Sequence, residues 1–284
     1  MLTVRSTDRA RGSTASPRAR TPARCGPVGG HRSRRPEPCP PALLRPSGLA
    51  EHPRLGRNLA IHPAVSVAGR FAGAVTGPGA GPNILQSVGV DEWHDEGILT
   101  EATAAPPCLT SFVLPHLGKE LKRELDDAGR LGLLGAMVSD RSSGRVRGAH
   151  RPVASCTLHA EDGRRLLRSV THRGRILFAA GAREVLTGIP AHPSVTSPAD
   201  LDDVVRRTGH HRLHLPAFHP TGTAALGADD RHSPVLPDGQ LRGAEGVLVA
   251  DAGLLPSSPG VNPQITMMAS AHAVTEQAVR RDGG

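Results

Sequence analysis

Apolar and polar positions alternate in several short stretches of the chain, and this alternation predicts strands. Residues 64–71 (AVSVAGRF), 83–93 (NILQSVGVDEW) and 211–217 (HRLHLPA) each carry such a pattern. Residues 246–253 (GVLVADAG) form a continuous apolar run instead. A run of this kind is typical of a strand that is buried on both faces.

Longer stretches carry apolar residues at helical spacing. Leucines recur along residues 116–138 at nearly one per turn, so this stretch predicts one amphipathic helix that is weakened at Gly129. Residues 160–182 place leucines on one side and arginines on the other, and Gly181 follows the last turn. Glycine is the residue that most often ends a helix, so we expect a second helix there.

Two further helices are indicated by their starting residues. Ser197 is suited to cap a helix over 197–209, because its hydroxyl can accept a free amide of the first turn. Asn262 and Pro263 are suited to begin a helix over 262–279 in the same way. Strands and helices do not alternate strictly along the chain, and this order predicts an α+β fold.

The net charge of +8 comes from the N-terminal region. Residues 1–46 contain ten arginines against Asp8 and Glu37, and the rest of the chain is neutral overall. Residues 1–38 have no hydrophobic period, so we expect a disordered tail there. A transit peptide, a twin-arginine signal and a mistranslated leader are alternative interpretations of this tail. A basic nucleic-acid binder is disfavoured because only the tail supports it, and aromatic residues are only 2% of the chain.

Cysteine usage and hydropathy give the expected compartment. Cys25, Cys39, Cys108 and Cys156 stand at no spacing typical of a metal site or a disulfide framework. No apolar run approaches the roughly 18 residues of a membrane span. We therefore expect a cytoplasmic protein without a membrane span, and the sequence leaves its oligomeric state open.

Two local motifs imitate known binding sites. Residues 77–82 (GPGAGP) resemble a dinucleotide-binding loop, but a proline and a predicted strand follow where a helix should begin. Residues 210–214 (HHRLH) could place His210 and His214 on one helical face to hold a metal. The segment alternates as a strand instead, so we predict no metal site.

Three separated residues form a better candidate site. His219 follows a predicted strand within FHPTGT, Asp251 ends the buried strand, and Asn262 begins the last helix. An imidazole can accept a proton near neutral pH. The amides at a helix start can stabilise negative charge on a reduced flavin. The combination favours an oxidoreductase that removes a hydride and a proton from an alcohol.

The same residues resemble the glucose–methanol–choline (GMC) oxidoreductases, a family of FAD-dependent alcohol oxidases and dehydrogenases. The likeness is carried by His219 with Gly222 and Thr223, then by GVLVADAGLLPSS (246–258) and GVNPQIT (260–266). Residues 40–50 (PPALLRPSGLA) and 55–63 (LGRNLAIHP) are similar to the family's second signature and to the connector that follows it.

The resemblance implies a role for each matching residue. His219 would be the catalytic histidine and Asn262 its partner beside the flavin. The residues implied to bind FAD are Asp251, Ala252, Asn262, Pro263, Gln264 and Thr266.

The resemblance also implies how the chain is divided. Residues 39–63 would be a connector of the FAD domain, 64–217 a substrate-binding domain with a mostly antiparallel sheet, and 218–284 the final strand and helix of a Rossmann-like FAD domain. The family's opening glycine motif is not found, so we expect an incomplete member that binds little FAD alone. The alternatives are an inactive fragment and a non-enzymatic binding protein. Neither the alcohol nor the electron acceptor is specified.

Overall fold

The computed structural model describes residues 40–49, 52–75, 86–103, 110–111, 114, 116–141, 144–148 and 152–282. The predicted disordered tail and the GPGAGP motif lie outside the described residues. So do three of the four cysteines, and Cys156 is a free thiol.

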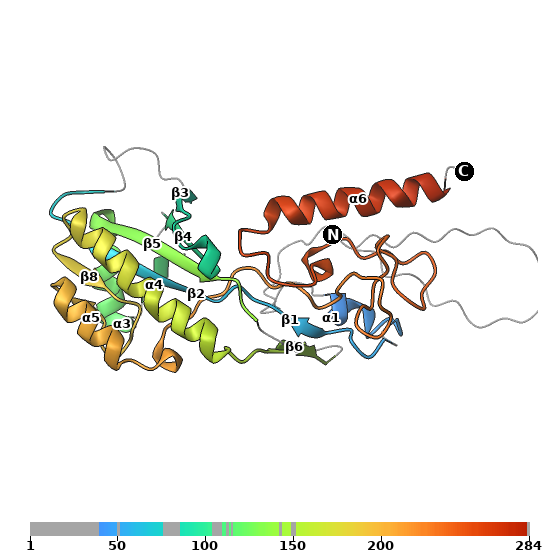
Figure 1. Ribbon diagram of the computed structural model, residues 1–284, viewed down its shortest axis with the longest axis horizontal. Helices are drawn as coiled ribbons and strands as arrows, with labels where there is room; N and C mark the ends of the chain where they lie inside the picture. The colour runs from blue at the N-terminus through green and yellow to red at the C-terminus, as the bar shows by residue number, and fades with distance from the viewer. Residues whose placement is uncertain are drawn as a thin grey trace, which may run out of the picture.

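An antiparallel sheet of six strands forms one end of the molecule (Figure 1). The strand order is β3-β4-β5-β2-β8-β9, and each neighbouring pair is antiparallel. The strands are β2 (Ala64–Arg70), β3 (Gln86–Val90), β4 (Ile98–Thr103), β5 (Leu131–Val138), β8 (Glu184–Leu186) and β9 (Ser194–Val195). The predicted α+β class with an antiparallel sheet is confirmed.

Helices cover both faces of this sheet. Helices α4 (Ala160–Ala179) and α5 (Pro198–Arg207) pack on the face that carries Val65 and Val67 of β2. Helix α3 (Gly118–Asp126) packs on the face that carries Ala68. Successive side chains of a strand point to opposite faces, so β2 contributes to two hydrophobic layers.

The predicted start of α5 and the predicted end of α4 are confirmed. The hydroxyl of Ser197 accepts the amide N–H of Asp200 at 3.1 Å, which caps α5 as predicted. Gly181 follows α4 with a φ of 95°, a left-handed conformation that glycine adopts without steric cost. Arg173 of α4 is fully buried and donates to the carbonyl oxygens of Val65 and Leu134 at 2.6 and 2.8 Å. It thereby joins α4 to the backbone of the central strands.

The single helix predicted over residues 116–138 is wrong. Helix α3 ends at Asp126, the 3₁₀ turn η2 (Ala128–Arg130) follows, and residues 131–138 form β5. This stretch contains Gly132 and Gly135, which weaken a helix. It pairs with β2 on one side and β4 on the other. Pairing on both sides outweighs the leucine spacing.

A second hydrophobic cluster lies at the other end of the molecule, where Figure 1 shows α1, β1, β6 and α6. Helix α1 spans Pro40–Leu44, and a small sheet has the order β1-β6-β7. Its strands are β1 (Arg57–Leu59), β6 (Gly144–Arg147) and β7 (Val153–Ser155). The division of the chain into domains remains a prediction.

Helix α6 (Gln264–Asp282) is attached to this second cluster by one buried residue. Val274 is 4% exposed, whereas Ile265 and Met268 are 77% and 57% exposed. The predicted C-terminal helix is therefore present, but most of its surface faces outward.

Two predicted strands are not formed as regular strands. Residues 210–212 form the 3₁₀ turn η3 (His210–Arg212). The rest of the stretch makes an isolated bridge at Ala217 and scattered backbone hydrogen bonds at His214 and Pro216, rather than a regular ladder. Pro216 lacks an amide N–H and so weakens pairing there.

The second is the apolar run 246–253. Its first part pairs with a local turn, where Leu241 donates to the Val247 carbonyl and Val249 donates to the Gly239 carbonyl. Its last part enters a 3₁₀ turn, and the carbonyls of Ala252 and Gly253 accept hydrogen bonds from the loop at residues 222–224. The described residues supply a local turn as its partner, and they place no parallel strand beside it.

Candidate active site

His219 lies in a short loop that is held at both ends by the segment before β2. Ala60 and Thr221 exchange two backbone hydrogen bonds of 3.1 and 2.9 Å, and Pro63 bridges to Ala217. The two pairings are antiparallel. They set residues 218–220 opposite residues 61–62.

Gly222 allows this loop to approach β1. Its φ is 83°, and a Cβ placed on it would lie 2.2 Å from the backbone oxygen of Asn58. The Asn58 side chain donates to the Pro256 carbonyl at 2.7 Å. Only glycine fits both the conformation and the separation. One short segment of β1 therefore anchors the His219 loop and the loop that leads to Asn262.

The His219 ring is half-buried and favours the neutral form. Burial lowers the pKa of His219 below its ordinary value. Its Nδ1 is buried and has no hydrogen-bond partner among the described residues. A neutral imidazole with an accessible nitrogen can act as a proton acceptor.

His62 is a second histidine of the candidate site, and no pattern in the sequence distinguishes it. It is 1% exposed, and its ring lies edge-on to that of His219 with the centroids 5.5 Å apart. Its Nε2 accepts the backbone N–H of Gly260 at 3.1 Å. Burial lowers the pKa of His62 to about 4, and the neighbouring His219 contributes in the same direction.

Asn262 is brought to the site through Gly260, but it does not cap α6 as predicted. The helix begins at Gln264, and the carbonyl of Pro263 accepts the first helical hydrogen bond, from Met267. The side-chain amide of Asn262 donates to Glu101 of β4 at 2.7 Å, and its Oδ1 is buried without a partner in the described structure. Because the helix begins at Gln264, Asn262 lies before the cap position and its side chain reaches the sheet instead.

Glu101 is therefore another site residue that the sequence did not reveal. It belongs to β4, and 161 positions separate it from Asn262. No local pattern marks such a residue, because it meets the site only through the packing of the sheet against the C-terminal loops.

Asp251 lies beside the Gly222 loop. Its carboxylate accepts the N–H of Gly253 at 2.7 Å and caps the 3₁₀ turn η4 (Ala252–Leu254). Gly222 and Ala224 donate to the carbonyls of Ala252 and Gly253. Burial raises the pKa of Asp251.

The predicted FAD-binding residues divide into two groups. Asp251, Ala252, Asn262 and Pro263 are buried or half-buried, whereas Gln264 and Thr266 are exposed on the first turn of α6. Near the first group, His219 Nδ1, Thr221 Oγ1 and Asn262 Oδ1 are buried without hydrogen-bond partners among the residues described. Buried polar atoms normally find partners. Their unfilled donors and acceptors fit a flavin ring edge or another polar ligand.

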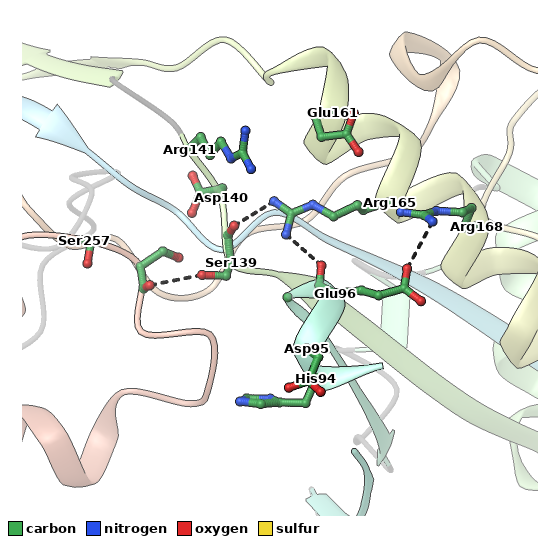
Figure 2. A pocket seen from close by; sticks show the side chains of 12 residues that line it. His94, Asp95, Glu96, Ser139, Asp140, Arg141, Glu161, Arg165, Arg168 and Ser257 are labelled. Carbon is green, nitrogen blue, oxygen red and sulfur yellow. Dashed lines mark hydrogen bonds and ion pairs between the residues drawn. The ribbon is translucent and has the colours of Figure 1, made fainter. Parts of the chain in front are cut away.

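A polar cleft of about 690 Å³ lies nearby, between the start of α4, the turn η1 (His94–Glu96) and residues Ser257–Ser258. Figure 2 shows Arg165 reaching across it to the backbone of Ser139 and Glu96, while Arg168 pairs with Glu96. None of the predicted site residues lines this cleft. Its charged side chains largely satisfy one another, so it is not assigned to the reaction.

Neither a metal site nor a membrane-spanning helix is present among the described residues. His210, His211 and His214 do not assemble a metal site, since the described part of the chain has no group of three His, Cys, Asp or Glu side chains placed to hold a metal ion. Among the helices that the structure describes, none combines the length and apolar character that a bilayer crossing requires.

Comparison with known proteins gives consistent matches. Residues 140–271 match the family model described as GMC oxidoreductase. The chain is 50% identical over 243 residues to an uncharacterized GMC-type oxidoreductase of Mycobacterium tuberculosis, covering 85% of this chain and 38% of that protein. It is 26% identical to a long-chain-alcohol oxidase of Arabidopsis thaliana, covering 82% of this chain and 35% of the oxidase.

The fold is also similar to a solved structure. Formate oxidase of Aspergillus oryzae, whose FAD modification was studied in that structure, aligns with a TM-score of 0.57 at 15% identity. The alignment covers 82% of this chain and 48% of the oxidase. The chain spans less than half the length of the relatives named here.

Proposed function

We propose that the protein takes part in FAD-dependent oxidation of an alcohol, on the premise that residues 140–271 match the GMC oxidoreductase family model. The reaction converts a CH–OH group to a carbonyl. Because the chain covers only part of each named relative, the statement that a complete protein has this activity is itself part of the proposal.

The observation that carries this proposal is the state of His219. The ring is half-buried and has a lowered pKa, and its Nδ1 is buried without a hydrogen-bond partner among the described residues. A surface histidine would have none of these properties. The site therefore holds a neutral imidazole in the form that a proton-accepting step requires.

FAD, when bound, supplies the acceptor for the hydride that leaves the alcohol carbon. His219 accepts the proton of the alcohol hydroxyl at Nε2 as the O–H bond breaks. The electron pair of the broken O–H bond forms the second bond between carbon and oxygen, and the C–H hydrogen leaves with its own electron pair as hydride, so atoms and charges balance. Asn262 and Glu101 line the same site and orient polar groups of the ligand.

Residues next to His219 would hold the flavin. Asp251 and Ala252 follow the buried run 246–250, and the half-buried Asn262 and the buried Pro263 precede α6. The orphaned Asn262 Oδ1 could accept a hydrogen bond from a flavin ring N–H. We include Gln264 and Thr266 as contacts of the pyrimidine end, on the resemblance alone.

The substrate is proposed to be a small-molecule alcohol. Long-chain alcohols are the first compounds to test, because relatives named as long-chain-alcohol oxidases match most of this chain. We propose a cytoplasmic location, from cysteine usage, and no role in nucleic-acid binding.

The experiment is alcohol-dependent bleaching of the flavin. Residues 40–284 are joined to the upstream part of the Mycobacterium relative, purified with FAD, and mixed anaerobically with a primary alcohol. The proposal expects loss of oxidised-flavin absorbance with the alcohol and none with the matched methyl ether. A flavin-loaded protein that no alcohol reduces across a panel of chain lengths would refute it.

A further inference from the structure

His62 has an unusual backbone conformation. Its φ is 48°, a left-handed value that residues with a Cβ rarely adopt. The amides of Ile61 and His62 both donate to the Asp140 carboxylate, at 3.3 and 3.2 Å. This carboxylate holds the turn in its strained form and sets the direction of the His62 side chain.

The His62 ring connects two loops that are distant in sequence. Its Nε2 accepts the Gly260 amide at 3.1 Å, across a separation of 198 residues. Its edge contacts the His219 ring, with an interplanar angle of 86°. His62 therefore contacts both the loop that carries the proposed proton acceptor and the loop that leads to Asn262.

The hydrogen bond to Gly260 determines the protonation state of His62. An amide N–H can only donate, so Nε2 must carry a lone pair and the ring proton must be on Nδ1. Protonation of Nε2 would break this bond. It would also place a buried positive charge beside the His219 ring. The geometry therefore requires a neutral His62.

We propose that His62 is a positioning residue of the active site. It fixes the ring orientation of His219, and hence the direction of Nε2, and it fixes the loop from Ser257 to Asn262. The role assigned to His219 rests on the proposed function, whereas the structural coupling among His62, His219 and Gly260 does not.

Three substitutions separate the contributions of the hydrogen bond and the backbone. His62→Leu removes the acceptor. His62→Gln can place an oxygen where Nε2 lies and so keep the bond to Gly260. His62→Asn suits the left-handed backbone best but is too short to reach Gly260. His52→Gln is the matched control, because the two ring nitrogens of His52 contact only the backbone groups of Asp230 and Arg54, outside the candidate site.

The measurements are made on the 284-residue chain without flavin. Amide hydrogen exchange at Gly260 should accelerate about fivefold to tenfold in His62→Leu and His62→Asn, in line with the loss of one hydrogen bond. It should stay near the wild-type rate in His62→Gln and in the control. The imidazole ¹⁵N signals of His219 should shift in all three His62 variants, because each removes the ring that packs against it.

The coupling is overturned if His62→Leu leaves both Gly260 exchange and the His219 signals unchanged. It is also overturned if His62→Asn restores protection and His62→Gln does not, since the left-handed backbone alone would then explain the choice of residue at position 62.

A flavin-loaded chimera tests the catalytic consequence. If alcohol reduces the flavin of the chimera, His62→Leu should lower the rate of flavin reduction and His62→Gln should recover part of it. Equal rates in both variants and wild type would overturn the effect of His62 on the reaction. If no variant and no wild-type protein reduces while the exchange results hold, the proposed function fails and the coupling stands.

Discussion

Gly222 is the position at which one added methyl group should most directly disturb the candidate site. In Gly222→Ala, the new Cβ would lie 2.2 Å from the backbone oxygen of Asn58, at a φ of 83°. That separation is too short for a carbon and an oxygen, so the His219 loop or β1 must shift. Backbone hydrogen bonds join Ala60 and Thr221 next to this contact.

The expected cost has two parts. The left-handed conformation costs a residue with a Cβ about 1–2 kcal/mol. Crowding in a well-packed region costs about 1–3 kcal/mol more. Gly222→Ala should therefore lower the free energy of unfolding by about 2–5 kcal/mol. Part of this is offset because alanine has less freedom than glycine in the unfolded chain.

Gly48 provides a matched control. It has a φ of 73°, is exposed, and has no atom within 4 Å of a Cβ placed on it. Gly48→Ala therefore bears the conformational cost and the unfolded-state effect without the crowding. The difference between the two variants isolates the contact with Asn58.

Urea unfolding followed by circular dichroism measures both variants, and thermal melts give a second estimate. At about 2–4 °C per kcal/mol for a chain of this size, Gly222→Ala should melt several degrees below Gly48→Ala. Equal stabilities would refute the close packing of the His219 loop on β1. A Gly48→Ala variant that is the less stable of the two would do so as well.

Three further predictions concern titration, helix attachment and cofactor binding. The pKa of His62 is about 4 in the folded chain and 6.5 in the unfolded chain, so the unfolded state gains this proton first as the pH falls from 7 to 4. Wild type should therefore lose about 3 kcal/mol of stability relative to His62→Gln over this range. Urea-derived stabilities that fall in parallel for the two proteins would contradict this. Val274→Ala should lower the free energy of unfolding by about 2 kcal/mol, because it removes two buried methyl groups. Met268→Ala, at an exposed position, should change it by less than about 0.5 kcal/mol. Equal losses in urea unfolding would mean that α6 is not attached through Val274. The 284-residue chain should bind FAD weakly in a fluorescence titration, since its candidate contacts reach only the flavin end, and tight stoichiometric binding would show this expectation to be wrong.

Local chemistry in the sequence predicted the elements whose ends are marked by particular residues. Ser197 caps α5 and Gly181 ends α4 because capping depends on neighbours within a few positions. The strand β5 was assigned to a helix, because the leucine spacing of residues 116–138 cannot show that two strands pair with residues 131–138. Short apolar runs are ambiguous for this reason.

The candidate site was predicted in part for the same reason. His219 and Asn262 were identified by a family resemblance in their own segments. His62 and Glu101 were missed, because each joins the site through a contact that spans more than 150 residues. The Asn262 side chain also makes a contact to the sheet that its place before a helix did not indicate.

The most direct test of the central claim is the rate of flavin reduction in His219→Ala. The flavin-loaded chimera and its variant are mixed anaerobically with alcohol in a stopped-flow instrument, and His232→Ala, at an exposed position, is the control. A positioned acid–base group contributes about 10²- to 10⁴-fold, so His219→Ala should slow reduction by that factor and leave FAD bound. A variant that holds FAD and reduces it at the wild-type rate would contradict the assignment of His219 as the proton acceptor.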